Sequence, residues 1–107
     1  MQFRGGMTEL MRQAARIQRK IDQTKEELKD KEVVFGAAGD KVKATATFGG
    51  KLSRVEVDPA FLEAEGLELA LDAVVAAVNG AMEAADKGMA AELEKVTGGV
   101  KIPGVNA

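Results

Sequence analysis

The stretch KVKATATFGGKLSRVEVDPAF, residues 41–61, decides the fold of this chain. In its first part, apolar residues alternate with polar ones: Val42, Ala44, Ala46 and Phe48 with Lys43, Thr45 and Thr47. A period of two predicts a strand with one buried face and one wet face. Gly49-Gly50 then interrupts the pattern, and paired glycines accept the positive φ values of a two-residue hairpin turn. The stretch therefore predicts two antiparallel strands joined by a tight turn.

The returning strand, KLSRVEV, places Val55 and Val57 on the core side of the sheet. Leu52 falls out of phase with these valines, which indicates either a β-bulge or a position that faces a partner. Upstream, the apolar run EVVF, which begins at Glu32, predicts a third short strand. We therefore expect a three-stranded antiparallel sheet over residues 32–57.

A short helix is predicted directly after the sheet. Asp58 can act as the N-cap and Pro59 suits the first helical position, so the helix is expected over residues 59–65. Gly66 follows and closes it. The last long segment then predicts a helix over residues 67–97, with a flexible tail at residues 98–107.

The last helix carries an apolar repeat with a period of eleven residues: Leu67, Leu71, Val74, Val78, Met82, Ala85, Met89, Leu93 and Val96. Such a period keeps the apolar residues on one face of a nearly straight helix. At 1.5 Å per residue this helix would span about 46 Å, whereas a globular chain of this size is roughly 34 Å across. The helix must then project into solvent or lie against a second copy. We predict a homodimer interface at Leu71, Val74, Val78, Met82 and Ala85.

A ridge of small residues, Gly80, Ala84 and Gly88, runs along the same helix. Each glycine costs about 1 kcal/mol of helix propensity relative to alanine. Close approach of another part of the structure would explain this cost, and a hinge would explain it equally well.

The segment before the sheet predicts a long helix over residues 8–30, with Thr8 as a possible N-cap. Its apolar positions recur at spacings of three and four: Met7, Leu10, Ala14, Ile17, Ile21, Thr24 and Leu28. We call this row the seam, and a heptad seam of this kind packs against another helix. Arg12, Arg16 and Arg19 fall on the opposite face, with Lys20 beside them. From the residues alone, a solvated face is the commoner explanation of such a stripe.

Charge is divided unevenly along the chain. Residues 1–31 hold eight basic and five acidic side chains, whereas residues 58–97 hold two basic and nine acidic ones. The two ends therefore have opposite electrostatic character, although the net charge is only −2.

Composition argues against several functional classes. The 107 residues predict one domain, residues 1–107, with a thin core, because the only aromatic residues are four phenylalanines. Without histidine or cysteine, and with Ser53 as the only serine, the chain lacks the usual catalytic and zinc-binding groups, so we expect no enzyme and no cofactor. No phosphate-binding glycine motif is present, and we expect no small-molecule substrate. Without a signal-peptide or membrane-spanning run, a reducing cytoplasm is the expected location.

Three pieces of the sequence, in this order, carry a resemblance to a known family: LMRQAARIQ in the first helix, VEVDPAFL from the last strand into the short helix, and the AAVNGA region of the last helix. Together they resemble the YbaB/EbfC family of bacterial nucleoid-associated DNA-binding proteins. The resemblance covers nearly the whole chain. It implies an α+β protein that forms a tweezers-like homodimer, with long helices projecting from a central body.

The resemblance also implies binding to double-stranded DNA in the nucleoid, in a chromosome-organising or regulatory role. The residues it marks for DNA contact are Arg12, Arg16 and Arg19 of the first helix and Lys87 and Lys95 of the last; Lys20 joins them as a neighbour of the stripe. Lys87 and Lys95 stand among acidic residues, so the sequence assigns the last helix a smaller share of DNA contact. The alternative is a protein-interaction module that uses the projecting helices as a docking surface.

Overall fold

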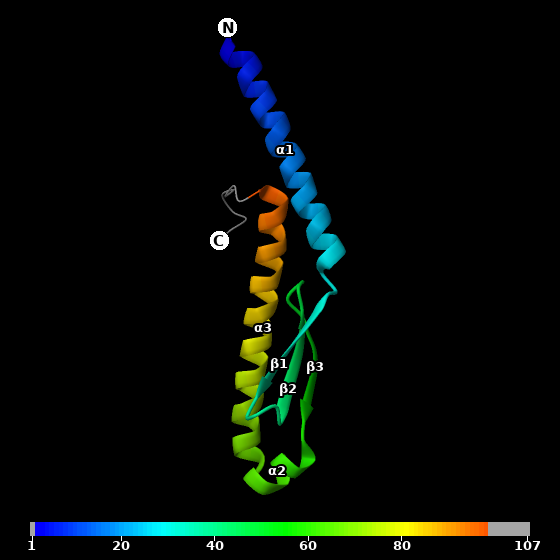
Figure 1. Ribbon diagram of the computed structural model, residues 1–107, viewed down its shortest axis with the longest axis vertical. Coiled ribbons are helices and arrows are strands. Elements are labelled where there is room, and N and C mark those ends of the chain that lie inside the picture. The colour runs from blue at the N-terminus through cyan, green and yellow to red at the C-terminus, as the bar shows by residue number, and fades with distance from the viewer. Residues whose placement is uncertain (1, 99–107) are drawn as a thin grey trace.

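The computed structural model of the chain describes residues 2–98. Its elements follow in the order α1 (Gln2–Leu28), β1 (Glu32–Ala37), β2 (Val42–Thr47), β3 (Leu52–Val57), α2 (Pro59–Glu65) and α3 (Leu67–Thr97), as Figure 1 shows. This is the predicted α+β arrangement. The predicted flexible tail lies outside the described residues, except for Gly98, which caps α3 in a left-handed conformation.

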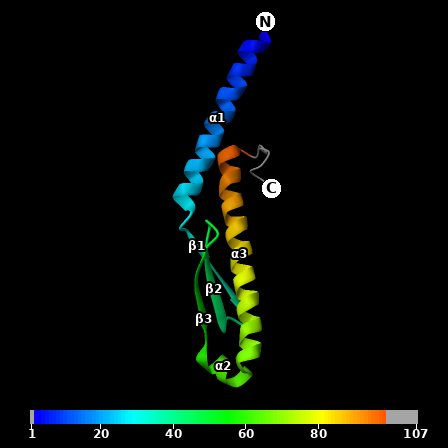
Figure 2. The ribbon, with the colours of Figure 1, turned by 180° about the vertical axis from the view of Figure 1, so that it is seen from behind.

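The molecule is a rod with extents of 75 × 20 × 16 Å and a radius of gyration of 20.0 Å. The sheet lies along one side of α3, and α1 continues past the C-terminal end of α3 (Figures 1 and 2). The comparison of α3 with a globule about 34 Å across was therefore wrong, because the chain is elongated along this helix. One side of α3 is covered by its own sheet and by α1.

Helix α1 begins at Gln2, ahead of the predicted Thr8, and ends at Leu28 rather than at residue 30. It runs through the two glycines that suggested a later start, since glycine weakens a helix by only about 1 kcal/mol per residue. At its other end, the Lys31 N–H donates to the Leu28 carbonyl at 3.0 Å and closes the helix. Ile21 is fully buried, so the seam packs against the body at this level.

The three strands form an antiparallel sheet in the order β1-β2-β3. Opposite Ala44 of the central strand lie Phe35 of β1 and Val55 of β3. Between β2 and β3 the register shifts, because Thr45 pairs with Arg54 whereas the next residue pairs with Leu52. This irregularity agrees with a β-bulge, the first of the two alternatives that the phase of Leu52 left open; Leu52 is also 46% exposed.

The hairpin between β2 and β3 differs from the predicted two-residue turn. Thr47 N–H donates to the Lys51 carbonyl at 2.7 Å, so three residues form the loop, and of its two glycines only Gly50 has a positive φ, +92°. Gly49 is small for another reason: a Cβ there would lie 2.9 Å from the Lys29 carbonyl oxygen. Its N–H donates to that same oxygen at 2.9 Å. The hairpin tip is therefore fastened to the end of α1.

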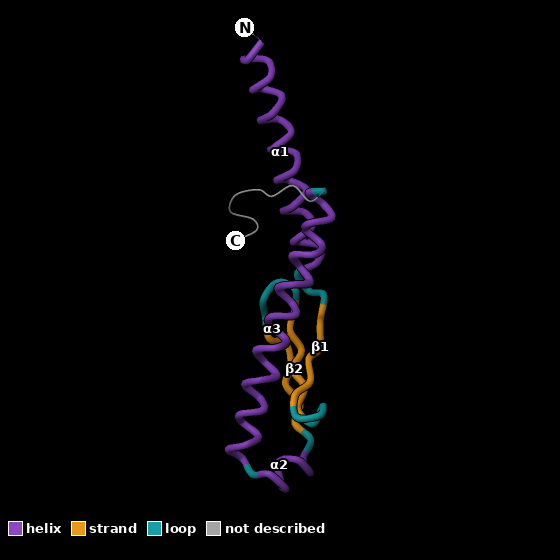
Figure 3. Tube along the Cα trace, turned by 60° about the vertical axis from the view of Figure 1, so that its left-hand side comes forward, coloured by secondary structure: helices purple, strands orange, loops and turns teal. Residues whose placement is uncertain are grey.

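Helix α3 runs along the sheet (Figure 3), and the core forms between them. The face of α3 that meets the sheet is made of small residues. Its buried members are Val42, Ala44, Ala46, Ala77, Ala81 and Ala85. Alternation along β2 thus predicted the buried face correctly. Thr45 is an exception to the expected wet face, because it is 5% exposed at the centre of the sheet, between Val34 and Arg54.

The two glycines of α3 leave room for aromatic rings of the sheet and the hairpin to pack against the helix backbone. A Cβ at Gly80 would collide with the ring of Phe35, and a Cβ at Gly88 would meet the ring of Phe48 at 2.5 Å. The ridge of small residues therefore allows close approach of the sheet, which settles the alternative between approach and hinge in favour of approach.

Helix α2 begins as predicted. The Asp58 carboxylate accepts a hydrogen bond from the Ala60 N–H at 2.9 Å, and Pro59 occupies the first turn. Gly66, at φ +88°, ends the helix and donates its N–H to the Leu62 carbonyl at 2.9 Å. This cap turns the chain back so that α3 can run along the sheet.

We predict that Gly80→Ala lowers the free energy of unfolding by about 1 kcal/mol. The collision with Phe35 should outweigh the gain in helix propensity of about 1 kcal/mol, because overpacking costs about 1–3 kcal/mol. Gly6→Ala is the matched control, since no described atom lies within 4 Å of its added Cβ, and it should stabilise α1. Urea denaturation followed by circular dichroism measures both. Equal stabilisation by the two variants would contradict the close packing of the Phe35 ring against Gly80.

Candidate nucleic-acid interface

The N-terminal part of α1 stands clear of the rest of the protein. Every side chain from residue 6 to residue 16 is exposed, and we call these residues the arm. From residue 6 onward, Ile17 is the first partly buried residue, and Ile21 is the first fully buried one. The arm therefore presents all of its faces to solvent, including the face that carries the arginines.

The structure brings the predicted basic residues of α1 together on one exposed side. Arg12, Arg16 and Arg19 are separated by four and three residues, so they share a helical face, and all three are exposed, as is Lys20. Arg12 forms an ion pair with Glu9 at 3.0 Å. Within residues 2–98, Arg16, Arg19 and Lys20 form no ion pair with a carboxylate. Two of the three arginines are thus free to bind an anion.

The two basic residues of α3 are in a different situation. The Lys87 ammonium lies 2.9 Å from the Glu83 carboxylate, and the Lys95 ammonium lies 3.5 Å from that of Glu92. The hydrogen bond with Glu83, together with its charge, raises the pKa of Lys87, and Lys87 lowers the pKa of Glu83 in return. These lysines are already compensated, unlike Arg16 and Arg19. Their spacings of four and three residues from the glutamates were the sequence signal for this pairing.

The predicted interface residues of α3 divide between the core and the surface. Ala85 is buried under its own sheet, whereas Val74, Val78 and Met82 are partly buried beside it. Leu71 is 53% exposed. With Leu67 and Val75, which are also exposed, it forms an apolar strip that nothing covers within the described part of the chain.

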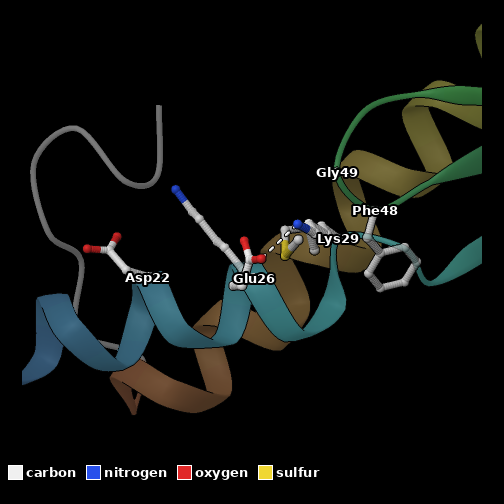
Figure 4. Close-up of a pocket in the computed structure, with 7 residues that line it drawn as sticks. Asp22, Glu26, Lys29, Phe48 and Gly49 are labelled. Atoms are coloured by element: carbon white, nitrogen blue, oxygen red, sulfur yellow. Dashed lines mark hydrogen bonds and ion pairs between the residues drawn. The ribbon is translucent and has the colours of Figure 1, made fainter.

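A hollow of about 430 Å³ lies where α1 meets the hairpin tip (Figure 4). Lys25 and Lys29 line it together with Asp22 and Glu26. Lys29 bonds to Glu26 at 2.7 Å, and this hydrogen bond and charge raise the pKa of the lysine. Positive and negative charges balance in the hollow, which gives it no electrostatic preference for phosphate.

Two further features bear on the kind of site that the chain offers. Within residues 2–98, no group of three or more acidic side chains is placed to hold a metal ion. In the same part of the chain, no helix combines the length and apolarity that a bilayer crossing requires.

Comparison with known proteins identifies relatives of this chain. A nucleoid-associated protein of Acetivibrio thermocellus is 36% identical over 104 residues, covering 96% of this chain and 92% of the relative. Another from Thermoanaerobacter sp. is 37% identical over 105 residues, covering 96% and 95%. The fold is similar to that of an uncharacterized protein from Helicobacter pylori, with a TM-score of 0.60 and 19% identity over 74% of this chain and 92% of that one.

The family signature covers the same elements. The sequence model of the YbaB/EbfC DNA-binding family matches residues 3–100, a span that contains the whole arm and all of α3. This span includes the exposed arginines, the sheet and the apolar strip of α3. With this match and with relatives of 36% and 37% identity over nearly their whole lengths, the chain belongs to the YbaB/EbfC DNA-binding family.

Proposed function

We propose that this chain is a nucleoid-associated protein that binds duplex DNA as a homodimer, mainly through phosphate contacts. Membership of a DNA-binding family and the names of the relatives support DNA as the ligand. The observation that carries the proposal is the exposed arginine stripe of α1, in which Arg16 and Arg19 have no carboxylate partner among the described residues.

The stripe suits a rod-like polyanion. Arg12 and Arg19 are seven residues apart, about 10 Å along the helix, which matches the rise of roughly three base pairs along the axis of duplex DNA at 3.4 Å each. Guanidinium groups remain charged and grip phosphate oxygens at two points. Such contacts position a protein on DNA without reading its sequence, so binding should be sequence-tolerant.

Helix α3 contributes less to DNA binding in this proposal. Lys87 and Lys95 are compensated by Glu83 and Glu92, and six acidic residues stand on this helix against two basic ones. Like charges repel the DNA backbone along most of α3. Binding therefore concentrates on α1 and has moderate affinity.

The homodimer is supported by the apolar strip of α3. Leu67, Leu71 and Val75 are exposed in the single chain, next to the partly buried Val74, Val78 and Met82. A run of large aliphatic side chains along one helix is the kind of surface that protein interfaces cover. Burying each leucine contributes about 1.5–3 kcal/mol. We place the dimer contact on this strip.

The proposed setting is the nucleoid, in the cytoplasm, with a chromosome-organising or regulatory role. The names of the relatives support the nucleoid. A protein-interaction module is the second candidate, favoured by the acidic surface and exposed leucines of α3. DNA binding by α1 distinguishes the two.

The test of DNA binding is the triple variant Arg12→Ala, Arg16→Ala, Arg19→Ala. Two protomers with three arginines each neutralise about six phosphates, so log K should fall with log salt at a slope near −5. The triple variant should bind every duplex more weakly and flatten that slope, while its circular dichroism stays unchanged because these side chains are exposed. Affinities for unrelated duplexes at several salt concentrations provide the measurement.

The matched control for this test removes the same charge elsewhere, through Lys43→Ala, Lys51→Ala, Arg54→Ala on the sheet and hairpin, where all three side chains are exposed. It should retain most of the affinity and the slope. Equal losses of DNA affinity in the two triple variants would mean that the arginine stripe acts only through the overall charge of the protein. Unchanged DNA binding in the arginine variant would favour the protein-interaction module.

The dimer contact is tested with Leu71→Asp. This leucine is 53% exposed in the single chain, so a carboxylate there should be tolerated by the fold but not in a buried interface. Loss of about 3 kcal/mol would raise the dimer dissociation constant by about 100-fold or more. Leu69→Asp, at a site 48% exposed on another side of α3, should leave the dimer intact. Analytical ultracentrifugation would contradict the placement if both variants sediment like the wild type.

DNA binding should be nearly independent of pH between about 6 and 8, because the chain contains no histidine. Because the pKa of Glu83 is lowered, the stabilisation from its ion pair with Lys87 is fully present above the ordinary carboxyl pKa and is lost only in acid. Because the pKa of Lys87 is raised, the same ion pair is lost on the alkaline side only at strongly alkaline pH. Fluorescence anisotropy at constant ionic strength should show a change below about twofold; a tenfold change would contradict the phosphate-contact mechanism.

A further inference from the structure

Lys20 is a lysine of α1 that no carboxylate faces along the helix. A helical side chain meets the side chains three and four positions away. For Lys20 these positions hold Arg16, Ile17, Gln23 and Thr24. The nearest acid in sequence is Asp22, whose spacing of two residues turns it away from Lys20, and its carboxylate accepts a hydrogen bond from Gln18 at 3.0 Å. The Lys20 amine is therefore exposed and uncompensated.

Within residues 2–98, every other lysine has a carboxylate or an aromatic ring near it. Ion pairs join Lys29 to Glu26, Lys41 to Asp58, Lys87 to Glu83 and Lys95 to Glu92. The remaining neighbours are the Phe48 ring for Lys31, Glu56 across the sheet for Lys43, Asp22 for Lys25 and Asp30 for Lys51. The hydrogen bond and the charge of the paired glutamate raise the pKa of Lys29 and of Lys87. A raised pKa keeps an amine protonated, without the free electron pair that a nucleophile needs.

Arg16 and Arg19 surround Lys20 with positive charge instead. Arg19 and Lys20 both lie one turn after Arg16, so the three cationic groups stand on one side of α1, and we call them the cationic triangle. All three are exposed, and none forms an ion pair with a carboxylate in the described part of the chain. Side chains four residues apart on a helix have Cβ atoms about 5–6 Å apart. A phosphate group gripped by Arg16 is therefore within reach of the Lys20 amine.

We propose that Lys20 is a modification site, at which small acyl phosphates acylate the amine after their phosphate group binds the cationic triangle. The neutral amine attacks the carbonyl carbon and forms the N–C bond of an amide. The C–O bond to phosphate breaks, and its electron pair leaves with the phosphate, which takes the proton that the amine loses. Phosphate is both the group that binds and the group that leaves, so the arginines stabilise the charge that develops on it.

Acylation of Lys20 regulates DNA binding under the proposed function, on which only this consequence rests. The amide replaces an ammonium beside the arginine stripe and removes one positive charge from each protomer. Loss of a phosphate contact weakens binding to every duplex alike. Bound DNA in turn occupies the cationic triangle and slows the acylation, because both ligands present phosphate oxygens to the same side chains.

Site-resolved mass spectrometry of the full chain, without DNA, tests the assignment. The protein is treated with acetyl phosphate and, in parallel, with N-hydroxysuccinimidyl acetate, an acetylating reagent that carries no phosphate. Lys25 is the reference, because it is an exposed lysine of the same helix with no arginine within one turn. After each rate is divided by that with the phosphate-free reagent, acetyl phosphate should acetylate Lys20 about fivefold faster than Lys25.

Two variants separate phosphate binding from the general reactivity of the amine. Arg16→Gln should slow acetylation of Lys20 by acetyl phosphate about fivefold, and should leave the rate with the phosphate-free reagent within about twofold. Arg12→Gln is the matched control, since it removes an exposed arginine of the same helix about 12 Å from Lys20 along the axis, and it should change neither rate. The assignment is overturned if Lys20 shows no preference over Lys25, or if Arg16→Gln does not slow the acetyl phosphate reaction selectively, whatever the DNA measurements show.

Discussion

The contact between the alanine face of α3 and the central strand β2 is the interaction on which the rest of the structure depends. Ala77, Ala81 and Ala85 meet Val42, Ala44 and Ala46, and small side chains on both sides let helix and sheet approach closely. The rings of Phe35 and Phe48 then fit over the two glycines of α3. Because the small residues face the sheet, Val74 and Val78 of α3 lie at the margin of this contact and Leu71 lies outside it, where these side chains remain accessible.

Most of the fold follows from local patterns in the sequence. Alternation along β2, the glycines of the hairpin and the Asp58-Pro59 start of α2 each specify their element through short-range chemistry. The start of α1 does not, because the seam predicts a helix but the two glycines near its beginning only weaken one. The three-residue hairpin was also missed, since the role of Gly49 depends on the Lys29 carbonyl, which belongs to a distant part of the sequence.

The candidate site was predictable in part. Spacing placed Arg12, Arg16 and Arg19 on one face, and the structure adds that this face is exposed and that two of the three lack a carboxylate partner within residues 2–98. The eleven-residue repeat of α3 contains residues of two different surfaces, one packed against the sheet and one exposed to solvent. Ala85 packs against its own sheet and Leu71 faces solvent, a distinction that needs the position of the sheet and cannot be read from hydrophobicity alone.

The attachment of the hairpin tip to α1 has a mechanical consequence. Phe48 and Gly49 donate their N–H groups to the Lys31 and Lys29 carbonyls at 2.8 and 2.9 Å, at the base of a helix about 40 Å long. A lever of that length amplifies small rotations, and a tilt of about 10° at its base would displace the tip by about 7 Å. The two backbone hydrogen bonds, together with the packing of the buried Ile21 against the body, therefore set the direction of the helix that carries the arginines.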